Sequence, residues 1–226
     1  MTVAKVEITL TQRLLWILNL VFHQVVAIVT VWLLWLFFDN FALDSIFLWH
    51  LVLSTAAYVP LMAEAIIVFA GDNLWSQGLE RPKKNWVHGV LLGISIVAVT
   101  AGIACEISRK NDRGAPHFVS DHAITGLVSW LLAFVSIILG LFSWHAQGLK
   151  NIARPVIFKF IHNFVGIACY AIGIASLCLG FYIGSFRRLV TDDQLKSLVA
   201  LVAIITFWSC LAAFKSCYSQ VKNMFS

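Results

Sequence analysis

Charged residues are scarce in this sequence. Asp, Glu, Lys and Arg make up 12% of its 226 residues, against about a quarter in a typical soluble domain. Hydrophobic residues reach 60%, more than a chain of this size could bury, because small domains expose much surface for their volume. The composition therefore excludes a soluble enzyme, a disordered chain and a fibrous protein, and it predicts an integral membrane protein.

Cysteine motifs that hold metals or haem are missing as well. The five cysteines form no Cys-x-x-Cys pair and no Cys-x-x-Cys-His motif of the kind that attaches c-type haem. They lie in apolar runs or at the ends of such runs, so we interpret them as small buried hydrophobic residues. The sequence also has no low-complexity segment and no Pro-rich linker. We therefore predict one transmembrane domain over residues 1–226.

The sequence contains several long runs of apolar residues. A helix needs about 20 apolar residues to cross the hydrocarbon core, whereas a transmembrane barrel strand shows alternation over about ten residues. The runs have helical length, so we predict an all-α fold, a six-helix membrane bundle in which spans two to five form the core. The predicted spans are near 14–38, 46–70, 86–107, 119–145, 157–184 and 195–217.

The distribution of basic residues predicts how the spans are oriented. The net charge is +5 and the pI about 9.1, which we attribute to Lys and Arg in membrane loops and not to nucleic-acid binding. Ten of the 16 Lys and Arg residues fall on one side of the predicted spans. Because cytosolic loops are enriched in these residues, we expect both termini in the cytosol. The ten are Lys5, Arg13, Arg81, Lys83, Lys84, Lys150, Arg154, Lys159, Lys215 and Lys222.

Histidines mark the entrance of four successive spans. A polar side chain inside a span is costly and usually has a function. His50 opens span two, and His88, His122 and His162 open spans three, four and five. Because successive helices enter from opposite sides, His50 and His122 lie at one depth (pair A), and His88 and His162 lie at the other (pair B). The sequence thus predicts one pair of imidazoles in each leaflet.

Each pair has the chemistry of a haem site. Two imidazoles on facing helices can supply both axial ligands of a haem iron, which leaves no open position for oxygen and suits electron transfer. Gly126 and Gly166 lie four residues after His122 and His162, on the same helix faces. We expect these glycines to let a flat macrocycle approach the backbone.

Other interpretations of the polar residues stay open. Structural zinc requires four clustered nitrogen or sulfur ligands, which the two separated pairs do not offer. A proton or metal transporter lined by His and Glu is the main alternative, because intramembrane His and Glu build proton relays. Glu64 needs a basic partner if it is buried. His23 and His145 have no matched partner in the pattern, so we interpret both as structural.

Four stretches carry a resemblance to a known family. They are Phe47-Leu-Trp-His50, Met62-Ala-Glu64-Ala-Ile-Ile-Val-Phe69, Pro116-His117-Phe-Val-Ser-Asp-His122 with Gly126, and His162 with Gly166. With these, the chain resembles the cytochrome b561 family over all six spans, most closely its cytochrome b561 domain-containing protein 2 type. One departure is Leu51 after His50, where many members have Pro. Proline is tolerated in a first helical turn but is not required there.

The resemblance implies a function, cofactors and partners. It implies a transmembrane ascorbate-dependent oxidoreductase with two haem b groups, held by the two pairs. Cytosolic ascorbate would be the electron donor, and monodehydroascorbate or a ferric chelate would be the acceptor on the other side of the membrane. It also implies a homodimer in the endoplasmic reticulum, another endomembrane or vesicle membrane, or the plasma membrane.

Candidate substrate residues lie in the loops beside the pairs. Ascorbate is a monoanion near neutral pH, so a cationic rim would concentrate it. By resemblance to the family, we expect Lys83, Lys84 and Arg154, which precede the two histidines of pair B, to bind ascorbate. His117 lies five residues before His122 and resembles a loop histidine of the family. We expect it to relay a proton or to contact a metal at the acceptor side.

Overall fold

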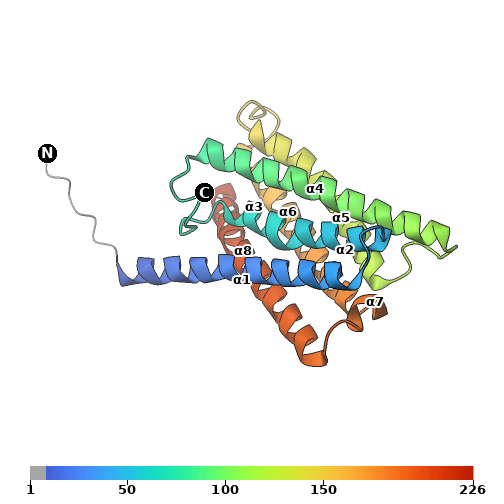
Figure 1. Cartoon of the computed structure of the whole chain (residues 1–226). Helices are drawn as coiled ribbons and strands as arrows, with labels where there is room; N and C mark the ends of the chain where they lie inside the picture. The colour runs from blue at the N-terminus through green and yellow to red at the C-terminus, as the bar shows by residue number, and fades with distance from the viewer. Residues whose placement is uncertain (1–8, 226) are drawn as a thin grey trace.

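Long helices joined by short loops make up the structure, a computed structural model that describes residues 9–225 (Figure 1). Lys5, one of the residues behind the predicted orientation, lies outside the described residues. The elements are α1 (Leu10–Asn40), α2 (Ile46–Ala56), the π-helical η1 (Ala57–Met62), α3 (Ala63–Ile67), α4 (Arg81–Asp112), α5 (Asp121–Trp144), α6 (Pro155–Phe181), α7 (Gly184–Arg187) and α8 (Asp192–Phe225).

Within residues 9–225, six helical segments are long and apolar enough to cross a membrane. They are α1, the continuous α2–η1–α3 segment, α4, α5, α6 and α8. The predicted all-α fold with six spans is therefore confirmed. The helices extend beyond the apolar runs, because the backbone hydrogen bonds of a helix do not need apolar side chains. The largest extension is in α8, which runs to Phe225 although the apolar run ends near residue 217.

Local sequence explains where several of the spans begin. Thr9 caps α1 in a capping box, in which its side chain accepts from the backbone N–H of Gln12 and the Gln12 side chain accepts from Thr9. Ser120 caps α5 through the backbone N–H of Ala123. The spans α4 and α6 carry a proline in their first turn, where its missing N–H costs no hydrogen bond.

The second span contains a local change of helical pitch. Six residues around Pro60 form η1, a π-helical segment between α2 and α3. Proline has no N–H and its ring clashes with the preceding turn of an α-helix. A π-turn widens the helix at this point and takes up one additional residue. The span therefore continues through the proline and ends at Ile67.

Two helix pairs form the centre of the bundle. The most extensive helix contacts join α5 to α6 and α2 to α4, and α1 and α8 pack on α2 and on α3 and α6, respectively. Small residues permit the closest approaches: a Cβ atom on Gly173 would lie 2.0 Å from Cε1 of Tyr58. Large apolar side chains such as Val97 and Phe207 are exposed on the outer faces, as expected for helices that contact lipid.

Candidate functional site

The four histidines at the helix entrances meet as the two predicted pairs. The ring centroids of His50 and His122 are 6.1 Å apart with an interplanar angle of 83°. Those of His88 and His162 are 6.2 Å apart with an angle of 86°. Pair A joins α2 to α5, and pair B joins α4 to α6. Each pair therefore bridges the two central helix pairs of the bundle.

Every one of these imidazoles is oriented by a backbone carbonyl. Their Nδ1 atoms lie 2.8–3.1 Å from carbonyl oxygens of the neighbouring helix, so Nδ1 carries the proton and donates. Nε2 is then left with its lone pair for a metal. The contacts are His50 with Gly102, His88 with Ala65, His122 with Ser176, and His162 with Ser136.

The spacing within each pair fits a metal between two imidazoles. An imidazole nitrogen binds a first-row transition metal at about 2 Å, and the ring centre lies roughly 1 Å behind it. Two such ligands in line place the ring centres about 6 Å apart, close to the separations in both pairs. The residues present therefore fit bis-imidazole ligation of a haem iron.

The histidines and the orienting carbonyls are regularly spaced along the helices. Each helix supplies a histidine near one end and, four turns later, the carbonyl that orients the histidine of its neighbour. The step is 14 residues in α4, from His88 to Gly102, and it is also 14 in α5 and α6. Fourteen helical residues rise about 21 Å. The two pairs are therefore separated by roughly that distance along the bundle.

An arginine and a phenylalanine flank one histidine of each pair. At pair A, the Phe47 ring stacks on His50 at 6.0 Å, and Cζ of Arg109 lies 4.6 Å from the Phe47 ring centre. Arg109 also makes a bidentate ion pair with Glu106. At pair B, Phe69 contacts His88 at 5.1 Å, and Cζ of Arg81 lies 4.4 Å from the Phe69 ring. Sequence analysis did not identify these cation–π contacts; an aromatic residue one helical turn before His50 was the available signal.

Glycines next to the imidazoles differ from the predicted ones. A Cβ atom on Gly180 would lie 3.0 Å from Cε1 of His122, and one on Gly140 would lie 3.1 Å from Cε1 of His162. Gly126 and Gly166 instead face the hydroxyls of Ser176 and Ser136, the residues whose carbonyls orient the same histidines. A contact of Gly126 and Gly166 with a macrocycle stays a prediction.

The predicted ascorbate residues lie at the pair B end of the bundle. Lys83 and Lys84 are in the first turn of α4. Arg154 precedes α6 and donates to the carbonyls of Met224 and Asn223, so it holds the end of α8. It also lines an open pocket of about 420 Å³ with Lys159. The remaining lining residues are Pro155, Val156, Gln220 and Asn223.

His117 lies in the loop between α4 and α5, next to pair A. Its Nε2 is 2.8 Å from Oδ1 of Asn111, which fixes the ring over the end of α4. Phe118, the next residue, has a positive φ of 52°, a backbone conformation that is uncommon for a residue with a side chain. The loop therefore holds His117 in a defined position and not as a freely solvated side chain.

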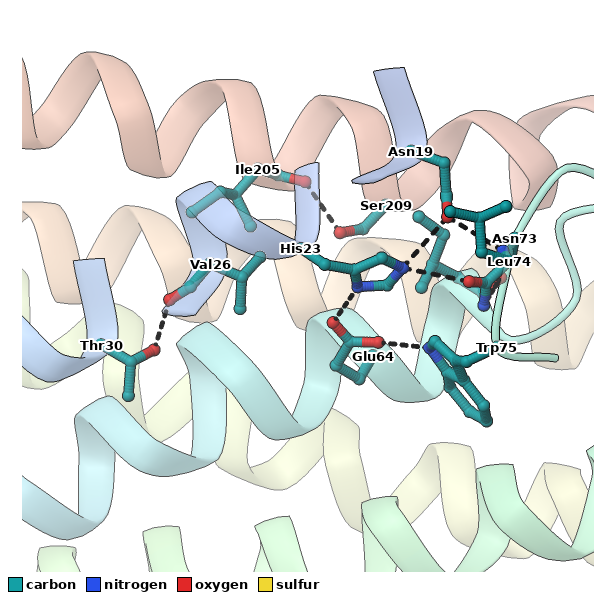
Figure 2. Close-up of polar contacts among 11 residues, drawn as sticks. Asn19, His23, Val26, Thr30, Glu64, Asn73, Leu74, Trp75, Ile205 and Ser209 are labelled. Atoms are coloured by element: carbon teal, nitrogen blue, oxygen red, sulfur yellow. Dashed lines mark hydrogen bonds and ion pairs between the residues drawn. The ribbon is translucent and has the colours of Figure 1, made fainter. Parts of the chain in front are cut away.

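Glu64 has the basic partner that burial requires. Its Oε1 lies 2.6 Å from Nδ1 of His23 in α1 (Figure 2). The pairing corrects the interpretation of His23 as a histidine without a partner, because the two residues belong to spans whose packing the sequence does not specify. His145, by contrast, is exposed at the end of α5. Within the described residues 9–225, no group of three or more His, Cys, Asp and Glu side chains is arranged to hold a metal ion.

Comparison with known proteins agrees with this architecture. Residues 49–187, which include both pairs, match the family described as Eukaryotic cytochrome b561. The chain is 29% identical over 148 residues to "Transmembrane reductase CYB561D2" of Mus musculus, covering 66% of each chain. It is 30% identical over 137 residues to the Homo sapiens protein of the same name, covering 61% of each. The alignments thus span about two thirds of those relatives or less. The chain belongs to the cytochrome b561 family, and this membership implies that it binds haem.

Proposed function

We propose that the protein transfers electrons across a membrane, from ascorbate on the cytosolic side to a one-electron acceptor on the other side. Two haem b groups, one at each histidine pair, would carry the electrons. The acceptor would be monodehydroascorbate or a ferric chelate, which makes the protein an ascorbate-dependent transmembrane reductase. The aligned relatives are named transmembrane reductases, which supports the same class of activity.

The observation that carries the proposal is the geometry of the two pairs. All four Nδ1 atoms are engaged by backbone carbonyls, and each pair has the ring separation that two axial ligands need. When bound, a haem supplies an iron that changes between ferric and ferrous forms and so carries one electron. The protein orients the imidazoles, and the two histidines of each pair would hold the iron through their Nε2 atoms. A second substrate therefore cannot bind the iron directly, which favours electron transfer over oxygen chemistry.

The space between the pairs is closed by a hydrogen-bonded layer. Tyr58 of η1 contacts the Ser129 hydroxyl of α5 at 2.8 Å, and Ser129 donates to the carbonyl of Cys169 in α6. All three residues are buried. The pairs are roughly 21 Å apart by helical rise, and macrocycles that extend toward one another would shorten that gap. Electrons could then pass between the haem edges without a further cofactor.

Charge supports pair B as the donor side. Lys83, Lys84, Arg154 and Lys159 gather at this end, and they attract an ascorbate monoanion. The positive-inside rule puts the same end in the cytosol. Monodehydroascorbate or an anionic ferric chelate would then approach pair A, where His117 lies. A homodimer in an endomembrane, such as the endoplasmic reticulum, or in the plasma membrane is part of this proposal.

The alternative, a transporter lined by His and Glu, has less support. A metal pathway needs clustered ligands, and residues 9–225 contain no such group of three. The imidazoles that could line a proton pathway have their Nδ1 atoms fixed on backbone carbonyls. A proton relay requires donors that can exchange partners. The two pairs are therefore better suited to hold a fixed metal than to pass a proton along.

An absorbance spectrum with haem quantification tests the proposed function. The purified protein should contain about two haems per chain, with Soret and α bands that sharpen and shift when ascorbate is added. His122→Ala should remove the haem of pair A, and His162→Ala should remove that of pair B. If the protein is colourless, or if both single variants keep two haems, the proposal is wrong. Retention of one haem in each variant would support the assignment of the pairs.

A further inference from the structure

A group of polar side chains lies between α1 and the end of the second span, outside the two histidine pairs. It consists of Asn19, His23, Glu64, Asn73 and Trp75, which we call the polar cluster (Figure 2). His23 and Asn19 come from α1, which lies before the residues that match the family. Neither the ligation of haem nor the binding of ascorbate requires these residues.

The contacts of His23 show how many protons the cluster holds. His23 Nε2 faces two amide oxygens, those of Asn19 at 3.2 Å and Asn73 at 3.1 Å. The amide orientations follow from their backbone partners: Asn19 Oδ1 accepts from the N–H of Leu74, and Asn73 Nδ2 donates to the carbonyl of Ile67. Because both amide oxygens accept, Nε2 must carry a proton.

A second proton lies between His23 and Glu64. His23 Nδ1 and Glu64 Oε1 are 2.6 Å apart, and two lone pairs would repel at this distance, so one of the two atoms must donate. Trp75 Nε1 donates to the other carboxylate oxygen at 3.0 Å. Whether the shared proton is on nitrogen or oxygen, the pair is electrically neutral. Loss of this proton would leave one negative charge in a low-dielectric region, so the pair forms a site for a single proton.

The proton site is linked to pair B by a short covalent and hydrogen-bonded path. Glu64 is followed by Ala65, whose carbonyl accepts from Nδ1 of His88 at 2.8 Å. The loop 68–80 supplies Asn73 and Trp75 to the polar cluster. The same loop contains Phe69, whose ring contacts His88. A change of charge at pair B therefore acts on the His23–Glu64 pair through the protein interior, where electrostatic interactions are stronger than in water.

The pair is partly exposed near the end of a span, and one buried donor of the polar cluster has no hydrogen-bond partner. The side chains of His23 and Glu64 are 18% and 23% exposed, and Trp75 is 43% exposed. Asn19 is fully buried, and its Nδ2 has no hydrogen-bond partner. This donor points to a bound acceptor oxygen, as a water molecule would supply. Glu64 lies three residues before the end of the second span, so the pair can exchange a proton with the aqueous phase at that end.

We propose that the His23–Glu64 pair is a proton-binding site that is occupied when the haem at pair B is reduced and released when that haem is oxidised. This inference rests on the proposed function. One-electron oxidation of the ascorbate monoanion breaks one O–H bond and gives the monodehydroascorbate radical anion, one proton and one electron. A haem held at pair B would take up the electron, and one proton would bind between Nδ1 of His23 and Oε1 of Glu64. When the electron leaves for pair A, the proton returns to water.

Neighbouring titratable groups do not account for such coupling. Tyr170 of α6 and Cys210 of α8 are buried titratable side chains on helices packed nearby, and Arg81 of α4, which keeps its charge at all relevant pH values, lies over the Phe69 ring. An ordinary phenol or thiol keeps its proton near neutral pH. Asp72 precedes Asn73 in the loop and makes no hydrogen bond or ion pair with His23 or Glu64, so it offers a matched control for a loss of negative charge in the same region.

Redox titration of the purified holoprotein as a function of pH tests the proposal. In the wild type, the equilibrium constant for reduction at pair B should fall up to tenfold per pH unit, which is about 59 mV for one electron, and pair A should change much less. Glu64→Gln and His23→Gln should remove most of this dependence, and Asp72→Asn should keep it. Infrared difference spectra between oxidised and reduced protein should contain a carboxyl or imidazole signal that Glu64→Gln removes.

Two results would overturn the inference, and both are separable from failure of the proposed function. The first is a wild-type potential at pair B that does not depend on pH, together with no uptake of protons from a weakly buffered solution on reduction. The second is an unchanged pH dependence in Glu64→Gln and His23→Gln variants that contain both haems. Haem content is measured independently, so a colourless protein would contradict the proposed function instead. The proton-uptake measurement uses the wild type and does not depend on whether a variant folds.

Discussion

At the scale of single residues, the histidines were predictable and their surroundings were not. The polar side chains stand out because they interrupt apolar runs, and the alternation of helix direction gives the pairing of His50 with His122 and of His88 with His162. The carbonyls that orient them, such as that of Gly102, carry no sequence signal, because every residue has a carbonyl. Sequence spacing selected Gly126 as a contact for the macrocycle, whereas the glycine beside the ring of His122 is Gly180.

The glycines beside the rings should be needed for haem binding. A larger side chain at Gly180 or Gly140 would press on Cε1 of His122 or His162, which a Cβ atom already approaches to 3.0 Å and 3.1 Å. We expect Gly180→Val to lower haem occupancy at pair A and Gly140→Val to lower it at pair B, each at least about threefold, because overpacking of this kind costs about 1–3 kcal/mol. Quantification of haem per chain and the position of the α band measure the effect.

Gly89 provides the control for these variants. It follows His88 directly, but a Cβ atom built on it has no neighbour within 4 Å. Gly89→Val should therefore keep both haems, since valine changes helix propensity only slightly and creates no clash. Equal haem loss in all three variants would mean that any valine in these spans is harmful, and the argument from the imidazole contacts would be wrong.

At the scale of secondary structure, hydropathy predicted the existence of the spans and missed their internal geometry. Apolar runs end where water begins, but helices such as α4 and α8 continue for several residues into charged sequence. The π-helical segment η1 was missed because proline more often ends or kinks a helix than shifts its hydrogen bonding. Its role follows from the number of residues between His50 and Ala65, whose carbonyl contacts His88.

The π-turn keeps the second span in step with the other three. In α4, α5 and α6, the residue whose carbonyl contacts a histidine of the neighbouring helix lies 14 positions after that helix's own histidine. In the second span the corresponding separation is 15, from His50 to Ala65. The additional residue is absorbed where the helix widens around Pro60. Both His50 and Ala65 therefore face the central bundle in spite of the longer sequence between them.

Deletion of Pro60 should consequently be tolerated. The variant would have 14 residues between the histidine and the carbonyl in the second span, and an ordinary α-helix would then bring Ala65 to His88. We expect two haems per chain and near-normal spectra. The matched deletion of Ser95, between His88 and Gly102 in α4, would rotate the carbonyl of Gly102 by about 100° relative to His88. It should abolish binding at one pair or both, and equal haem content in the two deletions would contradict this account.

At the scale of the whole molecule, the sequence predicted that one end of the bundle is rich in basic residues, and the structure adds the contacts that these residues make. Four basic residues of the predicted cytosolic side lie at the pair B end: Lys83 and Lys84 in the first turn of α4, and Arg154 and Lys159 at the pocket before and in α6. Arg154 is partly engaged by the carbonyls at the end of α8, which no pattern in the sequence could reveal, because the contact joins residues about 70 positions apart. Orientation itself depends on loop charge and on the membrane, so it stays a prediction.

The rate of reduction by ascorbate should depend on charge at the pair B end. Lys83→Gln with Lys84→Gln should slow the second-order rate about tenfold at low salt, because a cationic rim attracts the ascorbate anion. The wild-type rate should fall as salt rises, since screening is strong beyond about 8 Å at physiological ionic strength. Stopped-flow absorbance measures both effects. The Arg154→Gln variant is tested separately, because the substitution also removes the contacts of Arg154 with the end of α8. A reduction rate that does not change with salt concentration would exclude the cationic rim.

Transfer across the membrane should have a direction, with His117 serving the acceptor at pair A. The loop holds this histidine through Asn111, five residues before His122 and just ahead of the start of α5. An imidazole there can exchange a proton near neutral pH or bind a metal as the neutral form.

In sealed vesicles loaded with ascorbate, with the predicted cytosolic face inside, external ferric chelate should be reduced. His117→Ala should slow this step about a hundredfold, the lower end of the loss expected for an acid–base group, while haem content and reduction by internal ascorbate stay normal. His145→Ala, which changes an exposed histidine at the other end of the bundle, should leave the rate unchanged. If His117→Ala slows reduction by ascorbate before any acceptor is added, the orientation is inverted, and the basic residues at pair B would belong to the acceptor side.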